Sequence, residues 1–428
     1  MSRSRMKKLL VLGVLIWTAA TSLIFLQISQ SRLQKAIHAQ AEILERDVRS
    51  QLYSNEEVLD LLKRWKSVDE ARKTRREVIA VLVLAYNRLS VETTLKQLLR
   101  YRPPGIWFPI VLSQDGFHEK TAHLLREYQE RHGFQLIHQP DQTELTKGVS
   151  AIFNIEGYHR IARHYRWALN MVFNHFNYSA AIVLEDDLDI APDFFEYFGA
   201  LMPILRRDPS LFCVSAYNDN GKLQHVSSSP DMLHRTDFFS GLGWLLTREV
   251  WHELEPHWPK AFWDDWIRQP EQRKGRACVR PEISRSRTFG RKGVSRGQFF
   301  DKYLKDVHLS SVFVKFGSID LTYLLQHRYD PAFDAAVRGS SLRDLEDLLD
   351  SRVTQGPVRI TYTNEQHFKV IANYLGIMDD FKAGVPRTAY KGIVSTYYHG
   401  VRVFIVPRAQ QTTSTLLQRA RSNEAVSG

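Results

Sequence analysis

Ala180-Ala181-Ile182-Val183-Leu184-Glu185-Asp186-Asp187 is the stretch that decides the fold of this chain. A continuous apolar run of this length is typical of a β-strand that is buried on both faces. The adjacent carboxylates that follow it repel one another, and the end of a buried strand is a costly place for negative charge. The stretch therefore predicts a central strand whose carboxyl end meets something cationic.

Alternating strands and helices surround this strand. Apolar or β-branched runs predict further strands, and helical patterns lie between them. The strands are expected at 78–84, 108–112 and 134–138, and the helices at 91–99, 121–132 and 159–173. This alternation predicts an α/β, Rossmann-like doubly wound sheet. Such sheets bind ligands beyond the carboxyl ends of their strands, where Arg88 and Asp115 stand.

The acidic triplet has two interpretations. If strand geometry persists, Glu185 and Asp187 project to one side and Asp186 to the other. The two sides could then hold a divalent cation and a polyhydroxyl ligand, and hard oxygen ligands suit Mn²⁺ or Mg²⁺. The alternative is that these acids cap the next helix. Capping explains Asp189 and Asp193 well, but it does not explain three acids closing an apolar strand, so the metal interpretation is favoured.

The N-terminus predicts a membrane anchor. Residues 1–8 are basic, and residues 9–28 carry no charged side chain. As a helix, that stretch spans about 30 Å, the thickness of the hydrocarbon core. Preceding positive charge predicts a cytoplasmic tail and a lumenal remainder, and a cleaved signal peptide is the alternative. Residues 29–77 are expected to form a stem, as a solvated helical spacer or a short coiled coil.

Composition narrows the class of partner. The net charge of +11 predicts an anionic partner, such as a phosphorylated substrate, membrane headgroups or nucleic acid. No zinc-finger spacing or aromatic RNA-binding signature supports nucleic acid, so none is expected. The two cysteines, Cys213 and Cys278, cannot supply a four-ligand zinc site. In the cytosol they would be buried thiols, whereas an oxidising lumen would allow one disulfide.

Two further segments contain candidate catalytic or substrate-binding residues. Trp263-Asp264-Asp265-Trp266 places two carboxylates between aromatic rings, and partial desolvation there would suit a general base. The alternative is a pair of helix-start acids flanked by core tryptophans. Ser284–Gly297 is rich in arginine and glycine, which predicts a mobile lid over a diphosphate or, alternatively, an ordinary solvated basic loop.

Several runs together resemble one enzyme family, glycosyltransferase family 13, the N-acetylglucosaminyltransferase I family. The resemblance covers roughly residues 78–408. It is carried, in order, by 161–169, 185–187 with 191–198, 235–239, 241–244, 261–266 and 275–284. The family implies a GT-A fold, UDP-GlcNAc as the donor, Mn²⁺ as the cofactor and inversion at the anomeric carbon.

The resemblance also implies roles for single residues. It makes Asp264 the catalytic base, with Asp265 as the competing assignment, and Asp187 the metal ligand. The implied substrate-binding residues are Arg88, Asp115, His164, Glu185, Asp186, Trp263 and Ser295. From the residues alone, His164 could equally be a satisfied core histidine. Cys213 and Cys278 match a family disulfide, whereas Tyr86 and Gly116 stand where animal members carry another pair of cysteines.

These observations predict a type II membrane protein of the Golgi with a lumenal catalytic domain. The expected order after the stem is a GT-A domain at 78–303, a linker at 304–326, a smaller C-terminal domain at 327–408 and a tail at 409–428. The expected reaction transfers GlcNAc in β-1,2 linkage to the α-1,3-linked mannose of a high-mannose (Man5) N-glycan, which starts hybrid and complex N-glycan synthesis. The alternatives are a protein O-mannose β-1,2-N-acetylglucosaminyltransferase and a non-catalytic Golgi glycan-binding protein.

Overall fold

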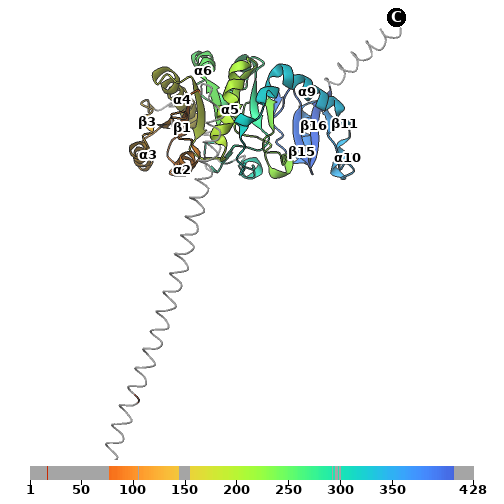
Figure 1. The fold of residues 1–428 in the computed structure, drawn as a ribbon, viewed down its shortest axis with the longest axis horizontal. Helices are drawn as coiled ribbons and strands as arrows, with labels where there is room; N and C mark the ends of the chain where they lie inside the picture. Colours follow the sequence, from red (N-terminus) through yellow and green to blue (C-terminus); the bar gives the residue numbers. More distant parts are fainter. Residues whose placement is uncertain are drawn as a thin grey trace, which may run out of the picture. The chain divides into compact units, whose positions relative to one another are not determined.

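The computed structural model describes most of the chain beyond the predicted stem (Figure 1). The described residues are Trp17, 77–104, 106–143, 155–291, 293–294, 297 and 300–408. The predicted N-terminal tail, the anchor apart from Trp17, nearly all of the stem, and the C-terminal tail lie outside them. Within these ranges, no helix combines the length and the hydrophobicity that a bilayer crossing requires. All of them except Trp17 belong to one compact unit, Val68–Gly428.

A mixed eight-stranded sheet forms the centre of this unit, with the strand order β3-β2-β1-β4-β8-β6-β9-β7. Its strands are β1 (Ile79–Ala85), β2 (Ile110–Gln114), β3 (Gln135–His138), β4 (Ala180–Glu185), β6 (Leu211–Ser215), β7 (Leu233–Thr236), β8 (Trp244–Thr247) and β9 (Ala277–Pro281). The first four strands are parallel, as a doubly wound sheet requires, but β8 runs antiparallel to both β4 and β6. The α/β prediction is therefore confirmed, with a mixed second half.

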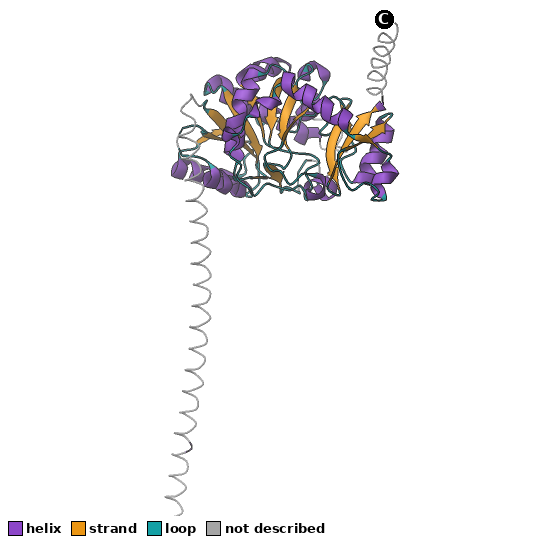
Figure 2. Cartoon of the chain, turned by 45° about the vertical axis from the view of Figure 1, so that its right-hand side comes forward, coloured by secondary structure: helices purple, strands orange, loops and turns teal. Residues whose placement is uncertain are grey.

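Helices cover both sides of this sheet (Figure 2). They are α2 (Val91–Tyr101), α3 (Glu119–His132), α4 (Ile155–Asn170), α5 (Phe194–Arg207), α6 (Arg248–Leu254), α7 (Trp263–Ile267) and α8 (Pro270–Arg273). The first helix ends just before Pro103, which could not continue it. The next ends at Gly133, whose φ of 67° is the left-handed conformation that glycine adopts without cost. The helices predicted from periodicity are present, with ends shifted by a few residues.

The acids downstream of the triplet do not cap a helix. Asp189 lies in β5 (Leu188–Ile190), which pairs with β10 (Ser286–Thr288), and its carboxylate accepts a hydrogen bond from Arg287 at 2.7 Å. Asp193 occupies the N-cap position of α5 but makes no side-chain capping bond. Instead, it forms a fully buried ion pair with Arg285 at 3.0 Å. The capping interpretation of these acids is wrong, because each forms an ion pair with an arginine from a distant segment.

A second, four-stranded sheet lies C-terminal to the central one, in the order β11-β12-β16-β15 (Figure 1). Its strands are β11 (Ser341–Leu342), β12 (Val358–Tyr362), β15 (Val394–Tyr398) and β16 (Val401–Pro407). The accompanying elements are α9 (Gln326–Gly339), α10 (Leu345–Leu349), α11 (Glu365–Leu375) and a small hairpin of β13 (Phe381–Lys382) and β14 (Val385–Pro386). This sheet has a hydrophobic core of its own, centred on residues such as Phe368 and Ile405.

A disulfide joins two neighbouring strands of the central sheet. Cys213 in β6 and Cys278 in β9 are paired, with their Cα atoms 4.7 Å apart. This is the pairing that the family resemblance implied. We expect replacement of both cysteines by alanine to lower the free energy of unfolding by about 2–4 kcal/mol, because the open chain gains entropy when it unfolds. Denaturant unfolding would measure the change, and an unaltered midpoint would contradict the prediction.

A buried polar pair links β7 to the segment after β9 and makes stability depend on pH. His234 Nε2 lies 2.6 Å from Glu282 Oε2. Burial lowers the pKa of His234 to about 4. Burial alone would raise the pKa of Glu282, but hydrogen bonding to His234 and nearby positive charge lower it to about 2. At neutral pH the pair is therefore a neutral imidazole that donates to a carboxylate.

Both pKa values lie below those of the unfolded chain, so the pair stabilises the fold at neutral pH and loses this effect in acid. We expect the free energy of unfolding to fall as the pH drops from about 6.5 to about 4, by up to roughly 3 kcal/mol. A His234→Gln variant, which cannot titrate at this position, should show a flatter decline over that range. Denaturation series at several pH values would test this, and equal slopes in the two proteins would exclude His234 as the cause.

Candidate active site

A cavity of about 530 Å³ opens at the carboxyl ends of β1, β2 and β4. Its size is that of a site for a small organic ligand. Five of the residues predicted to bind substrate line it together: Arg88, Asp115, His164, Glu185 and Asp186. These residues come from four separate segments, and the parallel register of the strands brings them to one edge of the sheet.

The acidic triplet lies at the carboxyl end of β4, where Glu185 and Asp186 line the cavity. Strand β4 ends at Glu185, and Asp186-Asp187 form a turn rather than continuing the pleat. The Arg88 guanidinium therefore reaches both aspartates: Nη1 donates to Asp186 Oδ1 at 3.1 Å and also to Asp187. The prediction that they project to opposite sides is wrong, because strand geometry stops one residue too early. Arg88 is the cationic partner that the buried carboxylates require.

The carboxylates crowd one another electrostatically. Burial, with the neighbouring Asp187 charge, raises the pKa of Glu185 to about 7. Burial also raises the pKa of Asp186 to about 6, although Arg88 opposes that shift. One guanidinium thus compensates the negative charge at the end of β4 incompletely. The remaining negative charge of these carboxylates would stabilise a further cation at the carboxyl end of β4.

The geometry around Asp187 fits a divalent cation only if a ligand helps to hold it. Within the described part of the chain, no group of three or more His, Cys, Asp and Glu side chains is arranged to hold a metal ion. Mg²⁺-like cations often take one or two carboxylates and complete their shell with water and substrate phosphates. A Cβ at Gly290 would lie 1.9 Å from Asp187 Oδ2, so only glycine leaves room for this carboxylate. A cation shared between Asp187 and a diphosphate satisfies these constraints.

Asp115 and His164 also line the cavity and are both buried. Asp115 Oδ1 accepts hydrogen bonds from the backbone of Gly116 at 3.0 Å and from Gln142 Nε2 at 2.8 Å. His164 Nε2 is 2.7 Å from Ser113 Oγ, and burial lowers its pKa to about 4, so the ring is neutral. His164 is thus both a satisfied buried histidine and part of the cavity wall.

Side-chain packing and a backbone hydrogen bond hold the ends of β1 and β2 together. A Cβ at Gly116 would lie 2.6 Å from the Tyr86 ring, so the tyrosine packs directly against the glycine backbone. The Asp115 amide also donates to the Ala85 carbonyl at 2.9 Å. Packing and a hydrogen bond therefore fix the strand ends that carry Arg88 and Asp115.

The tryptophan and carboxylates of the second motif have different environments in α7. Trp263 is buried and stacks between Trp244 and Trp258, with ring centroids 5.9 and 5.7 Å away. The Asp264 and Asp265 side chains remain 44% and 39% exposed. The desolvation expected from the flanking tryptophans is therefore slight, because those rings point into the core and leave the carboxylates at the surface.

Two residues that sequence reasoning missed connect these parts. Tyr165 donates to Glu185 Oε1 at 2.8 Å, and its ring lies 4.3 Å from Trp263, so it joins the cavity to α7. Arg268 donates to Asp264 and Asp265, each at 3.0 Å. Nothing in the sequence distinguishes Tyr165 from other core residues of its helix. Arg268 could have been found from its spacing of four residues from Asp264.

The arginine-rich segment is only partly a loop. Arg285 is fully buried against Asp193, and Ser286–Thr288 form β10, so the start of the predicted mobile segment is fixed. Gly293 and Val294 line the cavity, and a Cβ at Gly293 would lie 3.1 Å from Arg88. Ser295 lies outside the described residues. Gly293 and Val294 thus belong to the cavity wall, whereas Arg285 and Arg287 at the start of the segment are held by ion pairs.

Comparisons with known proteins identify the family. The GNT-I family profile matches residues 19–417. Over 342 residues, the chain is 41% identical to the alpha-1,3-mannosyl-glycoprotein 2-beta-N-acetylglucosaminyltransferase of Arabidopsis thaliana, covering 78% of this chain and 76% of that protein.

Solved structures match more distantly. The mannosyltransferase PcManGT of Pyrobaculum calidifontis, in complex with GDP-Man and Mn²⁺, is 16% identical with a TM-score of 0.28 and covers 47% of this chain and 55% of its own. TarS of S. aureus is 10% identical with a TM-score of 0.34 and covers 49% and 59%. The match therefore spans less than two thirds of either solved chain. From the family profile and the Arabidopsis relative, the chain belongs to the GNT-I family.

Proposed function

We propose that this chain is an inverting, metal-dependent glycosyltransferase with a GT-A catalytic domain. In this proposal it transfers GlcNAc from UDP-GlcNAc, in β-1,2 linkage, to the α-1,3-linked mannose of a high-mannose N-glycan. One observation carries the proposal: a single cavity gathers Arg88, Asp115, His164, Glu185 and Asp186, and Tyr165 connects it to Trp263. The family and the relative from Arabidopsis support the reaction.

The donor would lie along the cavity with its nucleobase at Asp115 and His164. Its diphosphate would then lie at Arg88, whose guanidinium suits paired phosphate oxygens. Asp187 would hold the Mn²⁺ or Mg²⁺, which supplies Lewis-acid stabilisation of the negative charge on the departing diphosphate. Glu185 and Asp186 would accept hydrogen bonds from the sugar hydroxyls, and Gly293 and Val294 would limit the access of water.

Inversion requires a single in-line displacement at the anomeric carbon. Asp264 would take the proton from the acceptor hydroxyl as that oxygen forms the new glycosidic bond and the bond from sugar to phosphate breaks. Arg268 holds Asp264 Oδ2, which leaves Oδ1 for the acceptor hydroxyl. The products are the lengthened glycan and UDP.

We also propose that the protein is a type II Golgi membrane protein anchored by residues 9–28. This location rests on the charge pattern of the N-terminus, because those residues lie almost wholly outside the described part of the structure. The proposed catalytic and C-terminal domains would then face the lumen, where a disulfide such as Cys213–Cys278 is stable.

The direct test uses the full-length chain in detergent with UDP-GlcNAc and Mn²⁺. A Man5 N-glycan should gain one GlcNAc, detected by mass spectrometry, and the product should be sensitive to a β-specific hexosaminidase. Transfer only to an O-mannosylated peptide would reassign the acceptor. Binding of UDP without transfer to either acceptor would favour a non-catalytic glycan-binding role.

A further inference from the structure

The β13–β14 hairpin of the C-terminal region contacts one carboxylate of α7, Asp265. Lys382 Nζ lies 3.2 Å from Asp265 Oδ1, although the two residues are 117 positions apart in the chain. Resting on the proposed function, we propose that Lys382 and Arg387 are positioning residues of the transfer reaction. They hold α7 so that Asp265 serves as an anchor and Asp264 serves as the base.

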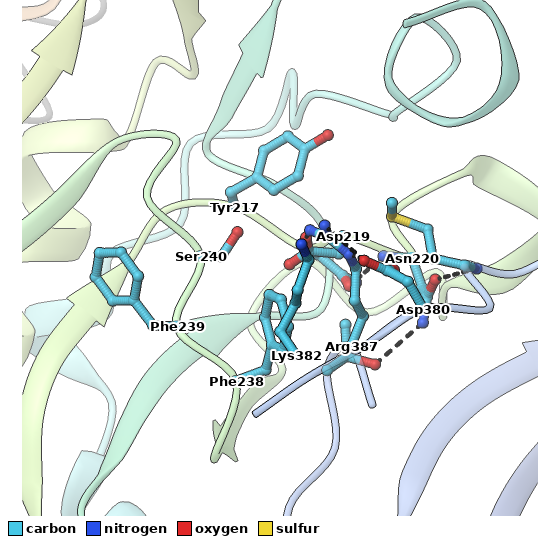
Figure 3. Close-up of polar contacts among 12 residues, drawn as sticks. Tyr217, Asp219, Asn220, Phe238, Phe239, Ser240, Asp380, Lys382 and Arg387 are labelled. Carbon is cyan, nitrogen blue, oxygen red and sulfur yellow. Dashed lines mark hydrogen bonds and ion pairs between the residues drawn. The ribbon is translucent and has the colours of Figure 1, made fainter. Parts of the chain in front are cut away.

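Arg387 fixes the hairpin to the central part of the fold. Its guanidinium donates two hydrogen bonds to Asp380, at 2.6 and 3.0 Å, and one to Asp219 at 2.5 Å. Figure 3 shows Arg387, the residue after β14, together with Asp219, Asp380 and Lys382 of β13. A fork of this kind loses little entropy when bound and resists rotation. The hairpin therefore has a defined position relative to the loop that follows β6.

Phe238 connects Arg387 to Arg268, the residue that follows α7. Its buried ring is flanked by two guanidinium groups, with Arg387 Cζ 4.8 Å and Arg268 Cζ 4.9 Å from the ring centroid. Cation–π contacts are strongest between partners that are shielded from water. The Arg268 Nε also donates to the Phe239 carbonyl at 3.0 Å. Arg268 is thus held from two sides before it reaches the carboxylates.

The two carboxylates of α7 therefore differ in the number of cationic side chains that contact them. Arg268 Nη1 contacts Asp264 and Asp265 at the same distance, 3.0 Å. Lys382 pairs with Asp265, so two cations contact Asp265, whereas among the described residues the cation that pairs with Asp264 is Arg268. Two cationic side chains hold Asp265 in place, whereas Asp264 contacts Arg268 through Oδ2 and keeps Oδ1 for the acceptor hydroxyl. The hairpin therefore distinguishes two adjacent acids that are chemically identical in the sequence.

The test compares Lys382→Met with Lys382→Arg in the full-length enzyme. We expect Lys382→Met to lower kcat about 3- to 10-fold with little change in the donor KM, because it disturbs orientation rather than binding. Lys382→Arg should restore most of kcat. Lys369→Met is the matched control, since Lys369 is equally exposed (38%) and pairs with Glu365 on α11. That control should keep the wild-type kcat.

A double-mutant cycle tests whether Lys382 acts through Asp265. If Lys382 acts through Asp265, Lys382→Met should have little further effect on kcat in an Asp265→Asn background. An undiminished effect in that background, an unchanged kcat in Lys382→Met alone, or a loss confined to the donor KM would each overturn the inference. An inactive wild-type enzyme would instead reject the proposed function, so the two failures are distinguishable.

Discussion

Replacing Asp264 with asparagine is expected to lower kcat by about 10²- to 10⁴-fold while UDP-GlcNAc still binds. The amide has nearly the shape of the carboxylate, but it cannot accept the proton of the acceptor hydroxyl. Asp264 is 44% exposed on α7 and lies outside the cavity wall that would hold the donor. Steady-state kinetics would measure kcat, and calorimetry with UDP-GlcNAc would measure donor affinity.

Asp265→Asn is the matched control, since it makes the same chemical change one residue away. In our assignment it removes an anchor and should cost about 10-fold in kcat or less. The reverse ranking, with Asp265→Asn nearly inactive and Asp264→Asn active, would transfer the role of base to Asp265. A loss of donor affinity in Asp264→Asn would show that this carboxylate binds UDP-GlcNAc instead.

Replacing Asp187 with alanine is expected to lower transfer by about 10²- to 10³-fold and to remove its dependence on Mn²⁺. Asp187 is the triplet member whose carboxylate the Gly290 backbone leaves room for, and it contacts Arg88 beside the cavity. Without this carboxylate, the cation that neutralises the leaving diphosphate would lose its protein ligand. Titration of activity with Mn²⁺, and of UDP affinity with and without Mn²⁺, would measure both effects.

Gly290→Ala offers a second route to the same site without removing the carboxylate. The new methyl group would collide with Asp187 Oδ2 and displace it, so the variant should weaken the response to Mn²⁺. Gly339→Ala provides a comparison at a glycine that, like Gly290, has no positive φ, but where an added Cβ would meet nothing within 4 Å. Normal Mn²⁺ dependence in both Asp187→Ala and Gly290→Ala would exclude Asp187 as the metal ligand.

Local patterns predicted much of the first half of the fold. The apolar runs of β1 and β4 are buried along almost their whole length, and periodicity located the helices between the early strands. The second half was harder, because β7 and β8 are short and their antiparallel pairing has no local signal. Helix capping was misjudged at Asp193, since its buried partner, Arg285, lies 92 residues away.

The same limit holds for the C-terminal region, whose Lys382 and Arg387 are drawn in Figure 3 together with Phe238. The sequence alone indicates no residue-level role for that region, yet its Lys382 reaches Asp265 and its Arg387 packs against Phe238. Ion pairs and cation–π contacts between distant segments depend on how the two sheets pack against each other. A short stretch of sequence carries no information about that packing.

The sequence by itself determined that a buried strand ends in the acidic triplet, that two carboxylates stand between tryptophans, and which enzyme family the chain resembles. These are properties of neighbouring residues, and local chemistry is sufficient to specify them. Only the tertiary structure decided that Asp186 and Asp187 turn together toward Arg88, and that Asp265 is compensated more fully than Asp264. Those outcomes depend on the charge that packing brings to each carboxylate.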